Sequence, residues 1–225
     1  MIKVSLIIPC YNEDKNIKDC INHIPHLPWE REIIVVDDGS TDKTKQIVAP
    51  LAGNNLKLIS YSANKGKGYA LKQGISLSKG EVIAVLDADY TTLPSNLAQV
   101  LLPLINNRCD FINGSRFVYP REGGAMQWSH LIANKFTAVI LSLVLGVRLT
   151  DTLCGFKAFR KKTFLELREY SWPDFELLIL AKKKRLRIQE VGVQYKCRKA
   201  NSSKMNTLRS CLHMPYLLLK SLLYR

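Results

Sequence analysis

The stretch EVIAVLDAD, residues 81–89, ends a short apolar run with two carboxylates, Asp87 and Asp89, that stand one residue apart. A continuous apolar run of this length is typical of a buried β-strand. Burial of both carboxylates at its exit without a cation would force one of them to take up a proton at considerable cost. Hard divalent cations bind through one or two carboxylates and share their other positions with water and substrate phosphates. We therefore expect Asp87 and Asp89 to hold Mg²⁺ or Mn²⁺.

A second acidic pair, Asp37 and Asp38, follows the apolar run 32–36. In an open α/β sheet the carboxyl ends of parallel strands converge on one ligand-binding crevice, so the two pairs are expected to share a cleft. A turn explains part of this pattern, because Gly39 permits a tight bend and the hydroxyl residues after it can cap a helix. One carboxylate remains to accept hydrogen bonds from the base or ribose of a nucleotide.

Apolar runs alternate with segments of helical spacing through the first half of the chain, which predicts an α/β fold built around a parallel sheet. The strands are expected at residues 4–9, 32–37, 56–61, 81–87 and 110–115. The helices are expected at residues 14–24, 42–50, 66–77 and 94–106. The last helix opens with Pro94, at a position where the missing N–H is harmless.

An apolar stretch, residues 131–149, follows a polar loop in the second half. Its longest part without charge, 136–147, is shorter than the roughly 20 residues of a membrane-spanning helix. We expect a helix that lies against the core or in the membrane interface. Residues 208–225 mix leucines with arginine and lysine, which is the composition of a basic amphipathic anchor at a membrane surface. The chain thus divides into one domain, 1–207, and this segment, for which a helix packed on the sheet is the alternative.

The composition sets limits on compartment and partners. The chain has 225 residues, enough for one sizeable core, and a formal net charge of +14. Such a charge attracts nucleic acids, anionic membranes or phosphorylated small molecules. Its six cysteines show no metal-ligand spacing and are expected to be reduced thiols. The first residues enter a strand at once without a signal-peptide pattern, so we expect a cytoplasmic protein.

A basic glycine-rich turn, NKGKG at residues 64–68, precedes the third expected helix. Backbone N–H groups around Lys65 and Gly66 can surround a phosphate at the start of this helix. The turn is not a Walker loop, since the spaced Gly-Lys-Ser/Thr pattern is absent from the sequence. No Gly-x-Gly-x-x-Gly follows the first expected strand, which argues against a dinucleotide enzyme.

The order of these motifs resembles the family 2 glycosyltransferases of the GT-A fold. The segments that carry the resemblance are VSLIIPCYNE at 4–13, VDDGSTD at 36–42, NKGKG at 64–68 and LDAD at 86–89. Further segments are similar to the branch that glycosylates polyprenyl phosphates, the dolichyl-phosphate mannose and glucose synthases. They are GSR at 114–116, DTLCGFK at 151–157 and EVGV at 190–193, followed by Ser203 and Lys204. The resemblance covers residues 1–204 and implies a mixed, mostly parallel sheet flanked by helices.

The resemblance implies an inverting transfer of a hexose from a nucleotide-diphosphate sugar to polyprenyl or dolichyl phosphate at the cytoplasmic face of a membrane. The implied donor-binding residues are Pro9, Tyr11, Glu13, Asp37, Asp38, Lys65, Gly66, Asp87, Ala88 and Asp89. The implied metal ligands are Asp87 and Asp89, and the implied catalytic residues are Asp89, Arg116 and Asp174. The acceptor phosphate is assigned to Arg116, Lys157, Arg198 and Lys204. These cations would hold two phosphates that repel each other.

Both UDP-glucose and GDP-mannose are open as donors. The segments CGFK at 154–157 and DFE at 174–176 look nearer to the glucosyl synthases, which favours UDP-glucose. A second hypothesis is a related transferase that acts on a sugar hydroxyl of a glycolipid or polysaccharide, which requires a general base such as Asp174 or Glu176. A third is a basic nucleic-acid-binding domain without catalysis. It gives no reason for aspartates at strand exits, and no nucleic-acid-binding motif is present, so we expect no nucleic-acid partner.

Overall fold

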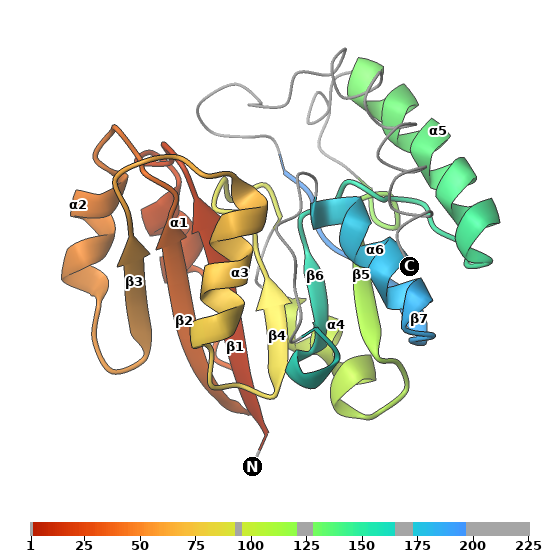
Figure 1. The fold of residues 1–225 in the computed structure, drawn as a ribbon, viewed down its shortest axis with the longest axis horizontal. Coiled ribbons are helices and arrows are strands. Elements are labelled where there is room, and N and C mark those ends of the chain that lie inside the picture. The colour runs from red at the N-terminus through yellow and green to blue at the C-terminus, as the bar shows by residue number, and fades with distance from the viewer. Residues whose placement is uncertain (1, 93–95, 121–127, 165–172, 197–225) are drawn as a thin grey trace.

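In the part of the chain that the structure describes, seven strands form one mixed, mostly parallel sheet in the order β3-β2-β1-β4-β6-β5-β7 (Figure 1). The computed structural model describes residues 2–92, 96–120, 128–164 and 173–196. The strands are β1 Lys3–Cys10, β2 Glu30–Asp37, β3 Leu56–Ser60, β4 Val82–Val85, β5 Phe111–Ser115, β6 Lys157–Arg160 and β7 Ile188–Gly192. Strand β6 runs antiparallel to β4 and β5, whereas β1 to β4 pair in parallel, as do β5 and β7. The predicted α/β fold class is confirmed.

Helices cover both faces of this sheet (Figure 1). They are α1 Ile17–Asn22, α2 Thr44–Val48, α3 Lys67–Leu77, α4 Leu97–Ile105, α5 Trp128–Leu145 and α6 Pro173–Lys183, with short 3-10 turns at Ala49–Leu51 and Lys161–Thr163. Buried side chains of α1, α2 and α4 share one core cluster with the sheet. Those of α3, α5 and α6 share the other. The sheet is therefore buried between two helical layers, as a largely parallel sheet requires.

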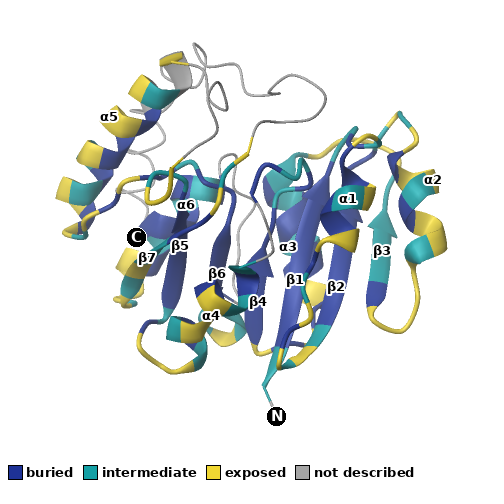
Figure 2. Cartoon of the chain, turned by 180° about the vertical axis from the view of Figure 1, so that it is seen from behind, coloured by how far each residue is buried: buried dark blue, intermediate teal, exposed yellow. Residues whose placement is uncertain are grey.

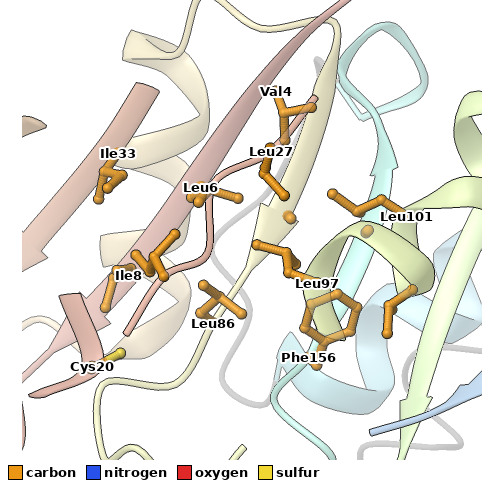
Figure 3. Packing of buried hydrophobic residues seen from close by; sticks show 14 of the residues in the cluster. Val4, Leu6, Ile8, Cys20, Leu27, Ile33, Leu86, Leu97, Leu101 and Phe156 are labelled. Atoms are coloured by element: carbon orange, nitrogen blue, oxygen red, sulfur yellow. The ribbon is translucent and has the colours of Figure 1, made fainter. Parts of the chain in front are cut away.

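The central strand β1 shows how the sequence builds both layers. Leu6 and Ile8 belong to one core cluster, and Ile7 between them belongs to the other. This division follows from the two-residue period of a strand, which sends successive side chains to opposite faces. Figure 3 shows the first cluster, where Leu6 and Ile8 lie near Leu86 and the α4 side chain Leu97. All three β1 side chains are fully buried.

The structure confirms the five predicted strands and the four predicted helices, with shorter bounds for most. Strand β4 ends at Val85, so Asp87 lies in the turn beyond it and not in the strand. The start predicted for α4 at Pro94 lies outside the described residues, and the helix is recorded from Leu97. Two strands, β6 and β7, were not predicted, because neither shows a long apolar run. Their sequences are KAFR and IQEVG.

The second half of the chain contains the predicted helix over the apolar stretch 131–149, recorded as α5. Among the described residues, no helix is both long and apolar enough to cross a membrane. The predicted amphipathic segment 208–225 lies outside the described residues, so the domain division remains a prediction. The cysteines within the described ranges, at positions 10, 20, 109 and 154, are buried free thiols, as expected.

We predict that Phe159→Ala will lower the free energy of unfolding by about 3–5 kcal/mol, the usual loss for a large aromatic side chain removed from a core. Phe159 is fully buried, and its ring centroid lies 4.3 Å from that of Phe164 and 5.9 Å from that of Phe111. Urea unfolding followed by circular dichroism measures the change. The matched control is Phe136→Ala, because Phe136 is 67% exposed and should change stability by no more than about 0.5 kcal/mol. Equal losses in the two variants would contradict this packing.

Candidate active site

The exits of strands β1, β2 and β4 lie side by side at the carboxyl edge of the sheet. The backbone N–H of Asp38, just past β2, donates to the carbonyl of Cys10 at 2.8 Å, and that of Leu86, just past β4, donates to Ile7 at 3.0 Å. Strand β1 has β2 on one side and β4 on the other, so the chain winds in opposite directions from it. Such a switch point opens a crevice beyond the strand ends, which is where α/β proteins bind ligands.

The predicted acidic pair at the β2 exit is buried and is held by the turns around it. The two carboxylate oxygens of Asp38 accept the backbone N–H groups of Lys65 at 2.9 Å and Gly66 at 2.8 Å. Those of Asp37 accept the backbone N–H of Ser40 at 3.0 Å and the hydroxyl of Ser60 at 2.9 Å. Asp38 therefore fixes the glycine-rich turn before α3 against the β2 exit. Both residues lie at the carboxyl edge of the sheet, where the sequence predicts the ligand-binding cleft.

The β1 exit is fastened to the loop that follows β2. Asn12, in a left-handed conformation with φ of 52°, donates its backbone N–H to the Ser40 hydroxyl at 2.9 Å. The backbone N–H of Glu13 donates to the Thr44 hydroxyl at 2.8 Å. The Glu13 carboxylate is buried and accepts from the Asn16 side chain at 2.8 Å. Of the predicted donor-binding residues at this exit, Pro9 lies in β1, whereas Tyr11 and Glu13 lie on the loop that these hydrogen bonds cross-link.

One ammonium group joins two of the predicted acidic residues. Lys67, the first residue of α3, donates from Nζ to Asp87 Oδ1 at 2.9 Å and to Asp174 Oδ1 at 2.7 Å. Burial alone would raise the pKa of Asp87, but the neighbouring cations, Lys67 first among them, hold it below its usual value. Burial alone would lower the pKa of Lys67, and the two carboxylates raise it instead. The site therefore contains a fixed carboxylate–ammonium–carboxylate arrangement.

Lys67 was not among the residues assigned from the sequence, although it stands in the glycine-rich turn that was singled out. The turn NKGKG contains two lysines, and the sequence pattern led us to assign Lys65 and not Lys67. The structure places the other, Lys65, over the ring of Tyr69, with its Nζ 4.5 Å from the ring centroid. Lys65 is exposed at the rim, whereas Lys67 reaches the carboxylates.

Asp89 lies on the same turn as Asp87, two residues further along. Its Oδ1 accepts the backbone N–H of Thr91 at 3.1 Å and the Thr91 hydroxyl at 2.8 Å. The Thr91 carbonyl accepts in turn from the backbone N–H of Lys196 at 2.9 Å, and Thr92 forms an isolated antiparallel bridge with Tyr195. The turn after β4 is thus tied to the chain that leaves β7. Ala88 between the two aspartates is buried.

The carboxylate of Asp87 rests directly on Gly155. A Cβ atom built on Gly155 would lie 1.7 Å from Asp87 Oδ2 and 2.1 Å from its Cγ, where no carbon can be placed. Gly155 belongs to the segment 151–157, which contributes two further groups to the site. Its glycine is therefore required by the position of the Asp87 side chain, a reason that the sequence alone could not show.

Arg116, at the β5 exit, forms a bidentate ion pair with Asp151. Its Nε and Nη2 donate to the two carboxylate oxygens at 2.6 and 2.9 Å, and Asp151 is fully buried. The Asn134 side chain of α5 donates to the same carboxylate at 3.0 Å. Burial alone would raise the pKa of Asp151, but Arg116 holds it below its usual value. The Arg116 guanidinium also lies over the ring of Tyr195, with its Cζ 5.2 Å from the centroid.

Lys157, at the start of β6, is an ammonium almost without exposure. It is 1% exposed, and its Nζ donates to the carbonyl of Cys154. Burial lowers its pKa, an effect that the nearby carboxylates of Asp174 and Asp151 partly oppose. The positive charge of Lys157 also helps to lower the pKa of Asp87. The structure thus brings Lys157 and Arg116 to the same region as Asp87, while Arg198 and Lys204 lie outside the described residues.

The predicted metal ligands fit a cation that is shared with a substrate. Within the described ranges, the chain has no cluster of three or more His, Cys, Asp or Glu side chains that could enclose a metal ion by itself. Asp87 and Asp89 are two hard oxygen donors on one turn, and Mg²⁺ characteristically takes one or two carboxylates and completes its shell with water and phosphate oxygens. The donor set therefore suits Mg²⁺ or Mn²⁺ bound together with a diphosphate.

Residues 5–168 match the family model described as Glycosyl transferase family 2. The chain belongs to this family. It is 34% identical to the UDP-N-acetylglucosamine–dolichyl-phosphate N-acetylglucosaminyltransferase of Methanococcus voltae, over 85% of this chain and 84% of that protein. It is 30% identical to the dolichyl-phosphate beta-glucosyltransferase of Saccharomyces cerevisiae, over 86% of this chain and 67% of that protein. The predicted family resemblance is confirmed.

Solved structures share the fold of this family 2 glycosyltransferase. Glucosyl-3-phosphoglycerate synthase from Mycobacterium tuberculosis, in complex with Mn²⁺, uridine diphosphate and glucosyl-3-phosphoglycerate, superposes with a TM-score of 0.75 at 19% identity. The match covers 98% of this chain and 80% of that one. The same enzyme in complex with Mg²⁺ and uridine diphosphate gives a TM-score of 0.73 at 20% identity, over 98% and 79% of the two chains. The GT-A fold predicted from the sequence is confirmed.

We predict that Asp151→Asn will destabilise the glycosyltransferase by about 3–5 kcal/mol, because it leaves the Arg116 guanidinium buried without its counter-charge. Asp110→Asn is the matched control. Asp110 also forms a bidentate pair, with Arg187, but the Arg187 side chain is 58% exposed, so this loss should be much smaller. Urea unfolding at neutral pH measures both variants. Similar losses would show that the Arg116–Asp151 pair is not a buried one.

The same pair predicts a pH effect of definite sign. The pKa of Asp151 is lower in the folded chain than in the unfolded one, so its contribution to stability is complete above about pH 4 and is lost as pH falls further. The parent enzyme should therefore lose more stability on acidification below pH ~4 than Asp151→Asn does. Parallel acid profiles for the two proteins would contradict this assignment.

Proposed function

We propose that this glycosyltransferase moves a hexose, with inversion, from a nucleotide-diphosphate sugar to a polyprenyl phosphate, and that it works as a peripheral protein on the cytoplasmic face of a membrane. The described site has the two kinds of group that such a transfer needs. Carboxylates of Asp87 and Asp89 stand on the turn after β4, and the cations of Lys157 and Arg116 come from the second half of the sheet.

The observation that carries the proposal is the burial of Lys157. An ammonium can donate three hydrogen bonds, and among the described residues the one recorded for Lys157 goes to a backbone carbonyl. A buried charge without a hydrogen-bonded counter-charge is costly. A phosphate group would supply the missing acceptors and the opposite charge at once. Such a phosphate group could belong either to the diphosphate of the donor or to the head of the lipid acceptor.

A divalent metal fits the carboxylate side of the site. Bound by Asp87 and Asp89, Mg²⁺ or Mn²⁺ would neutralise charge on the departing diphosphate. The chain's own residues set the position of that charge. Gly155 leaves room for the Asp87 carboxylate, because it has no Cβ. Lys67 donates a hydrogen bond to Asp87 Oδ1, and the Thr91 hydroxyl donates one to Asp89 Oδ1. The assignment of these residues as ligands is part of our proposal.

An ionised acceptor leaves Asp174 free for a role other than general base. A lipid phosphate already carries negative charge at neutral pH, so its oxygen can attack without a general base. Lys67 Nζ donates to Asp174 Oδ1, an arrangement that uses this carboxylate to orient the lysine. Arg116 and Lys157 would hold the acceptor phosphate, together with the predicted Arg198 and Lys204. The relatives named for transfer to dolichyl phosphate support this choice of acceptor.

The donor sugar has three candidates. The sequence favours UDP-glucose over GDP-mannose, and the beta-glucosyltransferase relative supports glucose. The Methanococcus voltae relative adds UDP-N-acetylglucosamine as a third candidate. Each sugar would be presented by the same carboxylates, so the choice depends on residues that contact the sugar ring.

We predict that the purified protein, with Mn²⁺ and a short polyprenyl phosphate, will form a lipid-linked sugar from one of these three donors. Mass spectrometry identifies the product and therefore the sugar. Asp89→Asn should reduce the rate at least about 100-fold, because it removes charge from the proposed metal site. Asp110→Asn, far from the site in an exposed ion pair, is the matched control and should keep the parent rate.

Other results of this assay would overturn parts of the proposal. No product with any donor, while donor hydrolysis continues, would point to a hydroxyl acceptor and to Asp174 or Glu176 as its base. In that case Asp174→Asn should abolish transfer to a glycolipid or polysaccharide while donor binding is kept. Full activity of Asp89→Asn would remove Asp89 from the metal site.

We also predict that Gly155→Ala will weaken Mn²⁺ binding in the presence of UDP at least about tenfold, because the new methyl must displace the Asp87 carboxylate. Electron paramagnetic resonance of free Mn²⁺ reads this affinity without turnover. Gly53→Ala is the matched control, since a Cβ on Gly53 meets no atom within 4 Å. Unchanged Mn²⁺ affinity in a folded Gly155→Ala protein would show that Asp87 is not a ligand.

A further inference from the structure

Helix α5 carries large apolar side chains on its solvent side. Trp128 is 79% exposed, Phe136 67% and Leu143 79%, and Ile132 and Val139 are exposed to a similar degree. These five residues follow one another at steps of four, four, three and four positions, so they lie on one face of the helix. We call this surface the α5 outer face. Figure 2 shows exposed residues along the outer side of α5.

The opposite face of α5 is buried. Asn134, Thr137 and Ala138 are buried there, and Leu141 and Leu145 belong to the core cluster shared with α3 and α6. The helix therefore already packs one face into the core. The exposed apolar row of the outer face is a second face, which the core does not cover. Soluble proteins rarely leave a continuous row of large apolar side chains in water unless the row binds something.

The buried face of α5 also builds the proposed acceptor site. Asn134 donates to Asp151, which holds Arg116, and its side-chain oxygen accepts the backbone N–H of Thr152 at 3.2 Å. The helix lies beyond the carboxyl edge of the sheet, where the strand exits converge (Figures 1 and 2). One helix thus contacts the Arg116 region with one face and presents an apolar row to the outside with the other.

Positive charge borders the outer face. Lys135 is exposed beside it, and Arg148 is exposed just past the helix. A Cβ on Gly146, at the end of α5, would lie 3.7 Å from Lys182 Nζ, so the basic end of α6 adjoins the end of α5. Exposed Lys183 and Lys184 continue this border. An apolar row flanked by lysine and arginine is complementary to the apolar interior and anionic head groups of a bilayer.

We propose that the α5 outer face docks in the plane of an anionic lipid bilayer and so places the Arg116 region at the depth of lipid head groups. This rests on the proposed function, because it assigns the membrane contact of the same acceptor site. A second copy of the chain is a poorer occupant, since each copy has a formal charge of +14 and its basic border would face that of its partner. The contact differs from the anchor predicted at residues 208–225.

The test compares vesicle binding of two double variants of the 225-residue chain. Phe136→Ser/Leu143→Ser removes two side chains of the outer face. Leu77→Ser/Leu102→Ser, on α3 and α4, removes two exposed leucines from elsewhere on the surface. Sedimentation with vesicles of phosphatidylcholine containing phosphatidylglycerol gives the partition coefficient. The outer-face variant should lose at least about tenfold, and the control should match the parent.

Two results would overturn the proposal. Parent-like sedimentation of the outer-face variant would place the membrane contact elsewhere, as in residues 208–225. A lipid-free parent that is dimeric by light scattering, with a monomeric outer-face variant, would assign the face to a second copy. Because the substituted side chains are exposed, both variants should keep the parent's circular dichroism and thermal midpoint.

A paired activity assay separates this proposal from the proposed function. With a short, water-soluble prenyl phosphate, the outer-face variant should turn over at the parent rate. With a long-chain polyprenyl phosphate in vesicles, it should lose at least about tenfold, since the acceptor is now reached only from the membrane. Absence of product from the parent with both acceptors would refute the proposed function, and the sedimentation experiment would still decide the role of the outer face.

Discussion

The ammonium of Lys67 holds together the two halves of the site. Asp87 follows β4, in the parallel half of the sheet, and Asp174 opens α6, in the half that contains the antiparallel strand. Two carboxylates turned toward each other at a partly buried edge repel strongly unless a cation lies between them. Other buried charges at this edge are also compensated: Asp151 by the Arg116 guanidinium, and Asp38 by two backbone N–H groups. Lys157 differs in that its recorded hydrogen bond within the described residues goes to a carbonyl, while the carboxylates of Asp174 and Asp151 act on it through their charge alone.

The antiparallel strand β6 explains why the second half of the chain reaches the site at all. Strand β5 ends at the carboxyl edge, and β6 begins at the same edge because it runs in the opposite direction. The chain between β5 and β6 therefore begins and ends at the carboxyl edge and has no need to return to the opposite edge of the sheet. Helix α5, Asp151 and Gly155 therefore gather above the strand exits, beside the turn that carries Asp87. A parallel strand in this position would have required a crossover to the far edge.

The sequence predicted the parts of the site that depend on local pattern. Apolar runs located the exits of β1, β2 and β4, and the aspartates after two of them were placed at one edge by the geometry of parallel strands. What it could not predict depends on contacts between distant segments. The choice of Lys67 over Lys65, the need for Gly155 and the binding of Asp151 by Asn134 follow from tertiary packing. Strands β6 and β7 were missed for a related reason, since strands of only four or five residues, each interrupted or bounded by charged side chains, lack a periodic signal.

The proposed reaction joins a water-soluble donor to a lipid, and the fold separates these demands between its halves. The parallel half, with Asp38 and Asp87, offers carboxylates and backbone N–H groups that suit a polar nucleotide. The segment between β5 and β6 supplies Lys157's neighbours and a helix with two apolar faces, one of which contains Asn134 among its buried residues. Because helical faces are set by residues three and four apart, the outer face can change without moving Asn134. Membrane contact and phosphate binding can therefore be altered independently, although one helix serves both.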